Sequence, residues 1–157
     1  FKKAILRRVT VTSTAKEAFE MMKGEHLGTG SFRSVYCNNL NPEQVLKIEG
    51  DTHQRYQFCN VIEWVFWNNH KENPKIAKWL APCIRISSNG KILIQKRVET
   101  IPKGYELPKE LPSFLTDLKM SNFGLLDGRL VCLDYGHSPK NIVTKNKSVD
   151  WCSYSYP

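Results

Sequence analysis

The sequence contains no CxxC pair, and its five cysteines are an odd number at wide spacing. Such a set is typical of neither a disulfide framework nor a zinc site. No apolar run approaches the roughly 20 residues that span a bilayer, and the charged first residues lack the apolar stretch of a signal peptide. These absences lead us to expect reduced thiols in a cytoplasmic protein that has no membrane partner.

An ordinary globular composition is present, with an excess of positive charge. The 157 residues are 41% hydrophobic and 24% charged, which favours one domain that folds without a disulfide or a metal. The formal net charge of +8 indicates an anionic or phosphorylated partner. Nucleotide, nucleic acid and acidic protein all fit this charge. Nucleic acid is the least favoured, because the tryptophans do not alternate with the basic residues as a stacking groove requires.

Turn residues and alternating apolar positions predict a five-stranded antiparallel meander in the first hundred residues. Asn89-Gly90, a preferred pair for a tight hairpin turn, separates the last two strands. A Gly-rich loop and a second turn-forming segment separate the first three. The expected strands cover residues 25–27, 33–37, 44–49, 84–86 and 92–94.

Two helices are expected beside these strands. A capping box followed by Gly24 as a stop predicts a short helix over residues 15–23. Within residues 54–70, Phe58, Ile62 and Phe66 recur at helical spacing. This spacing predicts an amphipathic helix that packs these side chains on the sheet.

Two opposite charges occur at positions where packing is expected. Lys47 lies between Leu46 and Ile48 in an expected strand, so its side chain points to the opposite face, toward either solvent or a ligand cleft. Glu63 falls on the apolar flank of the expected helix, where a carboxylate is costly without a cationic partner. We expect Lys47 and Glu63 to form an ion pair within about 4 Å. A solvated Glu63 is the alternative.

The second half of the chain is less regular. Prolines and a glycine predict an irregular linker over residues 100–112. Asp127-Gly128 predicts a second hairpin, and the polar tail after Gly136 is expected to have no regular structure. The expected organisation is therefore a single α+β domain over residues 1–157, with a sheet-containing part at about 1–99 and a smaller part at 113–157.

Three oxygen-bearing side chains are expected at the open end of that second hairpin. Counting outward from the turn brings Asn122 and Asp134 together, and Asp117 arrives at the same end. Carboxylate and amide oxygens of this kind hold magnesium while nucleotide phosphates supply the other ligands. The alternative is that each residue caps a turn.

The loop between the first two expected strands is rich in glycine. Its two glycines and small hydroxyl residues would let backbone N–H groups approach phosphates closely, although a lone GxG usually marks only a tight turn. The segment consists of Gly28, Thr29, Gly30, Ser31, Phe32, Arg33, Ser34 and Val35.

These motifs, in this order, resemble the protein kinase family. The segment from Gly28 to Val35 resembles the family's Gly-rich loop, Val45-Leu46-Lys47 its third-strand lysine motif, and Glu63 the glutamate of its C helix. The segment from Asp117 to Asn122 resembles the catalytic loop, and Asp134-Tyr135-Gly136 the DFG motif with Tyr for Phe. The resemblance implies a kinase-like N-lobe and a strongly reduced C-lobe that carries a catalytic-loop hairpin.

The resemblance also implies cofactors and residue roles. ATP and Mg²⁺ are the implied cofactors. The implied catalytic residues are Lys47, Glu63, Asp117 and Lys119. The implied nucleotide-binding residues are Gly28, Thr29, Gly30, Ser31, Phe32, Val35 and Lys47. The implied metal ligands are Asn122 and Asp134.

Departures from the family pattern leave the function open. Arg33 replaces the third loop glycine, Leu115-Thr116 stand where His-Arg would precede the catalytic Asp, and no APE motif follows. We expect a minimal ATP- and Mg²⁺-dependent kinase acting on a Ser/Thr hydroxyl of a protein, itself included. The alternatives are a pseudokinase-type domain that binds and regulates a host protein, and a phosphotransferase with a small-molecule acceptor. The brevity of the chain leads us to expect a bacteriophage-encoded protein of the host cytoplasm.

Overall fold

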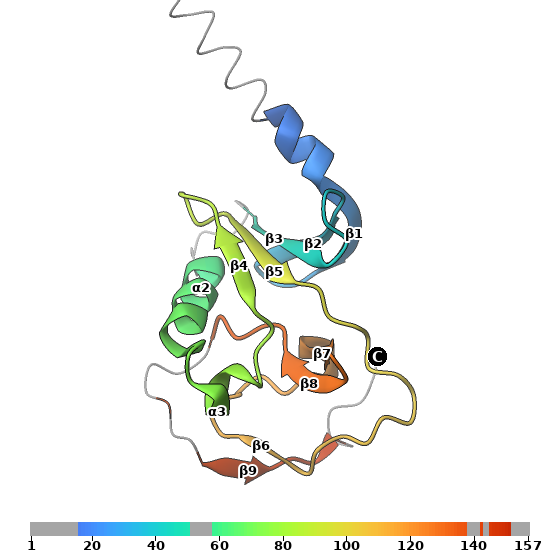
Figure 1. Ribbon diagram of the computed structural model, residues 1–157, viewed down its shortest axis with the longest axis vertical. Helices are drawn as coiled ribbons and strands as arrows, with labels where there is room; N and C mark the ends of the chain where they lie inside the picture. The colour runs from blue at the N-terminus through green and yellow to red at the C-terminus, as the bar shows by residue number, and fades with distance from the viewer. Residues whose placement is uncertain (1–15, 51–57, 138–141, 143–144, 152–157) are drawn as a thin grey trace, which may run out of the picture.

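A five-stranded antiparallel sheet is the largest element of the fold. The computed structural model describes residues 16–50, 58–137, 142 and 145–151. Its sheet has the order β1-β2-β3-β5-β4 (Figure 1). The strands are β1 (Lys23–Thr29), β2 (Arg33–Asn38), β3 (Gln44–Glu49), β4 (Cys83–Ile86) and β5 (Ile92–Lys96). The α+β class and the five-stranded antiparallel sheet are as expected from the sequence.

The first helix and the first strand differ from the expectation at their junction. Residues 16–22 are helical, and β1 begins directly at Lys23, so Gly24 lies inside a strand and is not a helix stop. A Cβ atom at Gly24 would lie 2.3 Å from Oδ1 of Asn39. Glycine is therefore needed here because the turn after β2 approaches the strand closely. The expected capping box includes Thr14, which lies outside the described residues.

Helix α2 (Cys59–His70) lies against the sheet, but with a different face from the one expected. Its buried residues are Cys59, Asn60, Glu63 and Phe66, whereas Ile62 is 39% exposed. Phe58 is not part of the helical face: it is the N-cap, in a left-handed conformation, and is 58% exposed. The apolar spacing was therefore correct for Phe66 and wrong for Phe58 and Ile62, because Asn60 and Glu63 face the sheet and form hydrogen bonds with it. Residues 54–57 of the expected helix lie outside the described residues.

The register of the sheet decides which face Lys47 occupies. Lys47 of β3 lies opposite Val35 of β2 and Leu93 of β5, so the three side chains share one face. Helix α2 lies on this face, because the Lys47 side chain reaches Glu63 of the helix, with Nζ 2.6 Å from Oε1. Lys47 therefore points toward the helix, away from the side of Leu46 and Ile48.

The second hairpin forms as predicted and is fixed to the first half of the chain. It consists of β7 (Phe123–Leu126) and β8 (Arg129–Cys132), with positive φ angles of 52° at Asp127 and 73° at Gly128 in the turn. Single bridges join Glu99 to Leu125 and Leu80 to Cys132. In the view of Figure 1 the hairpin lies between the five-stranded sheet and a third, smaller sheet.

This third sheet corrects two sequence expectations. Strand β6 (Glu110–Pro112) falls within the expected linker, and it pairs with β9 (Asn146–Ser148) in the tail that was expected to lack regular structure. Leu111 of β6 is fully buried. Three-residue strands are too short to show an alternating pattern, and the partner lies far along the sequence, so neither strand could be inferred locally.

The hydrophobic core draws on both halves of the chain. Phe66, Leu80 and Leu93 from the first half pack with Phe114 and Leu125 from the second. Two short helical turns complete the described elements, α3 (Pro74–Ala77) and the 3₁₀ turn η1 (Met120–Asn122). Among the described residues, no helix is both long and apolar enough to cross a membrane.

Candidate functional site

The expected ion pair between strand β3 and helix α2 is present. Nζ of Lys47 lies 2.6 Å from Oε1 of Glu63, and the two side chains are 5% and 0% exposed. Lys47 also donates to the backbone carbonyl of Leu133, which follows β8. The lysine head group thus joins the sheet, the helix and the second hairpin at one point.

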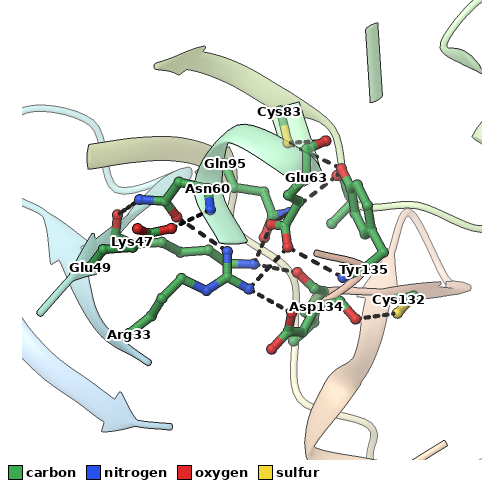
Figure 2. Close-up of polar contacts among 12 residues, drawn as sticks. Arg33, Lys47, Glu49, Asn60, Glu63, Cys83, Gln95, Cys132, Asp134 and Tyr135 are labelled. Atoms are coloured by element: carbon green, nitrogen blue, oxygen red, sulfur yellow. Dashed lines mark hydrogen bonds and ion pairs between the residues drawn. The ribbon is translucent and has the colours of Figure 1, made fainter. Parts of the chain in front are cut away.

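Both carboxylate oxygens of Glu63 accept hydrogen bonds. Its Oε1 accepts from Lys47 and, at 3.0 Å, from Nε2 of Gln95. Its Oε2 accepts from Arg33 at 3.0 Å and from the backbone N–H of Tyr135 at 3.2 Å (Figure 2). Charge-assisted donors on both oxygens compensate for the loss of water around a fully buried carboxylate.

Arg33 is a second buried cation in the same place, and we did not predict its role. Its Nη2 lies 3.0 Å from Oε2 of Glu63 and 2.5 Å from Oδ1 of Asp134 (Figure 2). Its Nη1 donates to Oδ1 of Asn60 at 3.2 Å. Burial alone lowers the pKa of Arg33, but the charges of Glu63 and Asp134 outweigh it and hold that pKa above its usual value.

The sequence contained part of the signal for Arg33, the alternation along β2, and the strand register supplied the rest. Arg33 and Val35 are two residues apart in β2 and therefore share a face, and Val35 lies opposite Lys47. The Arg33 side chain therefore lies on the same face of the sheet as Lys47, where a buried anion is already needed. Reading Arg33 only as a replacement for a loop glycine missed this alternation. We call Arg33, Lys47, Glu63 and Asp134 the four-charge network.

Asp117 and Asp134 line one small hollow beside this network. Their side chains are 40% and 39% exposed, so both carboxylates are open to solvent. The hollow is lined by Leu115, Thr116, Asp117, Cys132, Asp134, Tyr135 and His137. Nζ of Lys119 lies 3.8 Å from Oδ2 of Asp117 and is well exposed. The predicted convergence of the two aspartates is therefore present.

Asn122 lies at the same end of the hairpin. Its carbonyl accepts from the backbone N–H of Leu133 at 2.7 Å, which extends the β7–β8 ladder by one pair beyond Phe123 and Cys132. Its side-chain Nδ2 donates to the carbonyl of Asp117 at 3.4 Å. Asn122 thus links the loop that carries Asp117 to the segment that carries Asp134.

The oxygen atoms at this end of the hairpin are of the chemical type that binds magnesium. Mg²⁺ is held in proteins by one or two carboxylates with further oxygens from water and phosphate, and Asp134 and Asn122 supply such oxygens. No group of three or more His, Cys, Asp or Glu side chains that could hold a metal occurs among the described residues. One oxygen of Asp134 bonds Arg33, so a metal ion would meet a carboxylate that already has a cation.

The Gly-rich segment forms a tight hairpin turn between β1 and β2, next to Arg33 of the network. Backbone N–H of Gly30 donates to the carbonyl of Arg33 at 2.8 Å, and Thr29 lies opposite Ser34. The ring of Phe32 at the turn meets the ring of His137 edge-on, with 6.1 Å between centroids. The turn therefore reaches the residues that follow Asp134.

Tyr135 anchors the segment after Asp134 in the core. It is 2% exposed, and its hydroxyl donates to the carbonyl of Ala81 at 2.6 Å and lies 3.1 Å from Sγ of Cys83. Burial and the neighbouring Cys83 raise the pKa of Tyr135 well above its usual value. The fixed side chain of Tyr135 holds its backbone N–H in position to donate to Oε2 of Glu63.

The buried thiols should be protected from alkylation. Burial raises the pKa of Cys83 and of Cys132 to about 12, whereas Cys37 is partly exposed. Because the thiolate is the reactive form, we expect iodoacetamide at pH 8 to modify Cys37 at least about a hundredfold faster than either buried thiol. Peptide mass spectrometry would measure the rates, with protein in urea as the control. Equal rates in the folded protein would contradict the buried positions.

The chain matches no model of a known protein family and no curated protein sequence.

Proposed function

We propose that this chain is a minimal ATP-dependent phosphotransferase of the protein kinase type, acting on a Ser or Thr hydroxyl of a protein, itself included. The observation that carries this proposal is the buried ion pair of Lys47 and Glu63 beside a hollow lined by Asp117 and Asp134. A lysine fixed by a glutamate, next to two solvent-open aspartates, is the set of groups that phosphoryl transfer uses.

The proposed kinase function gives each of these residues a role. Lys47, oriented by Glu63, would bind the α- and β-phosphates of ATP. Asp117 would orient the acceptor hydroxyl and take its proton, and Lys119 would offset charge on the transferred group. Asp134 and Asn122 would hold Mg²⁺, which when bound neutralises phosphate charge.

The Gly-rich turn supports nucleotide binding by a separate argument. Neither Gly28 nor Gly30 is among the described glycines with positive φ, and a Cβ atom at Gly28 would meet nothing within 4 Å. Neither backbone conformation nor packing therefore requires glycine there. Close approach of a ligand to the backbone is a reason that remains.

A second candidate function is a pseudokinase-type domain that binds and regulates a partner protein without catalysis. The ion pair between Arg33 and Asp134 favours it, because it occupies the carboxylate that catalysis would give to a metal. Val61, Ile62 and Val65 of α2 are also 37%, 39% and 47% exposed, which leaves apolar side chains available on the helix.

Nucleotide binding should stabilise the folded protein and should need the metal. A ligand at about 100 times its dissociation constant adds about 2.7 kcal/mol to the free energy of unfolding. We expect ATP with Mg²⁺ to raise the melting temperature most and ATP with EDTA to raise it less. AMP with Mg²⁺ should raise it least, because AMP keeps only one of the two phosphates assigned to Lys47 and lacks the outer phosphates that would share the metal with Asp134. No shift under any condition would favour the non-catalytic function.

Labelled ATP would then separate the two functions directly. The protein is incubated with γ-labelled ATP and Mg²⁺, alone and with a cell extract. Label on the protein or on an extract component is the result expected of a kinase. Absence of label, together with an ATP-induced rise in melting temperature, would assign the chain to the non-catalytic candidate.

A further inference from the structure

The bond between Arg33 and Asp134 has a consequence for metal binding. Within the four-charge network, the side chain of Asp134 is open to solvent, at 39% exposed, whereas those of Arg33, Lys47 and Glu63 are 7%, 5% and 0% exposed. A divalent cation can therefore reach the network through Asp134 alone. At Asp134 the cation encounters the guanidinium of Arg33, whose Nη2 already lies 2.5 Å from Oδ1.

The charges of the network balance without any added ion. Arg33 and Lys47 contribute two positive charges, and Glu63 and Asp134 two negative charges, so the sum is zero. Among the described residues, no buried side-chain nitrogen or oxygen lacks a hydrogen-bond partner. A divalent ion at Asp134 would leave two excess positive charges next to a buried guanidinium, which repels them.

We propose that Arg33 is a resident cation that competes with a divalent metal ion for Asp134. A metal ion held by Oδ1 displaces the guanidinium from that oxygen, and one held by Oδ2 is repelled by the guanidinium that stays beside it. Arg33 retains Asn60 and Glu63 as partners when it is displaced, because those contacts come from α2 and do not depend on Asp134. The released donor on Nη2 becomes available to a new anion in the hollow.

A nucleotide phosphate is the anion that fits this exchange. It supplies the negative charge that Asp134 no longer gives to Arg33, and it supplies further oxygen ligands to the metal. Metal and nucleotide should consequently bind together much better than either binds alone. This step rests on the proposed nucleotide site, whereas the competition between Arg33 and the metal does not.

The competition is tested by direct metal binding, with no nucleotide present. Mn²⁺ is titrated into wild type and into Arg33→Gln, and free Mn²⁺ is measured by electron paramagnetic resonance. We expect Arg33→Gln to bind Mn²⁺ at least about tenfold more tightly, because a charge-assisted hydrogen bond no longer has to be broken. Adding Asp134→Asn to this variant should abolish the gain. Arg85→Gln, which removes an exposed arginine of β4, is the matched control and should bind as wild type does.

Arg33→Gln leaves the interior with one excess negative charge, so a second variant guards against loss of the fold. The double substitution Arg33→Gln and Glu63→Gln removes one charge of each sign and keeps the interior neutral. It should show the same tighter Mn²⁺ binding. An affinity equal to that of wild type in a folded variant would overturn the proposal, and so would a gain that survives Asp134→Asn. Tighter Mn²⁺ binding by the variants, together with no phosphoryl transfer by the wild-type protein, would instead overturn the proposed kinase function and support the role of Arg33.

Discussion

Asp117→Asn lowers the rate of phosphoryl transfer by about 10²- to 10⁴-fold, if Asp117 positions the acceptor and takes its proton as proposed. Asp117 is distinct from the ion pair assigned to the phosphates, so the affinity for ATP should change little. Initial rates with labelled ATP, together with ATP affinity from fluorescence titration, would measure both quantities. The effect therefore lies in turnover and not in binding.

The hairpin turn offers a matched control for this substitution. Asp127→Asn makes the same chemical change on an exposed residue whose φ of 52° asparagine tolerates well. Its transfer rate should equal that of wild type. If a folded Asp117→Asn protein kept full transfer activity, the proposed role of Asp117 would be wrong, and if it kept full biological activity without transfer, the partner-binding function would be favoured.

Glu63→Gln should cost the largest amount of stability of any single substitution considered. The change leaves Asp134, which contacts Arg33, as the one anion of the network against the two buried cations Arg33 and Lys47. It also places an amide N–H₂ among groups that all donate to Glu63. Removal of one member of a buried charge pair costs about 3–5 kcal/mol. Urea denaturation would measure the loss in free energy of unfolding.

An exposed glutamate provides the comparison for Glu63. Glu72→Gln, at an exposed position after α2, should change the free energy of unfolding by no more than about 0.5 kcal/mol. Adding Arg33→Gln to Glu63→Gln should recover part of the lost stability, because the interior becomes neutral again. A loss below about 1 kcal/mol for Glu63→Gln would mean that the network does not stabilise the fold.

Local patterns were sufficient for the sheet and the hairpins. Asn89-Gly90 and Asp127-Gly128 favour tight turns through backbone angles that these residues adopt readily, so both hairpins could be predicted. The face of α2 could not be predicted from apolar spacing. Its orientation depends on two tertiary hydrogen bonds with β3: Asn60 donates to the Lys47 carbonyl, and Glu63 accepts from Nζ of Lys47. The β6–β9 pair was missed for the same reason, since its partners are joined only in three dimensions.

The candidate site was predictable in part. The cost of burying an unpaired Glu63 was enough to infer its bond to Lys47, and counting along the hairpin was enough to bring Asp117 near Asp134. Arg33 was missed because an arginine beside a loop is ordinarily solvated. Only the register of β2 against β3 places it over the same face as Lys47. A charged residue whose burial depends on tertiary packing therefore cannot be identified from sequence patterns alone.

The four-charge network also bears on how the chain folds. Arg33, Lys47 and Glu63 come from the first half of the chain and sum to one positive charge, and only Asp134, after β8, restores neutrality. A fragment that ended at residue 99 would have to bury an uncompensated cation or leave its helix undocked. We therefore expect neither half to be a stable unit by itself, and the sheet and the hairpin to fold and unfold in one cooperative transition. Electrostatic neutrality, which the network reaches only when Asp134 is in place, should therefore couple the stability of the sheet to that of the last quarter of the chain.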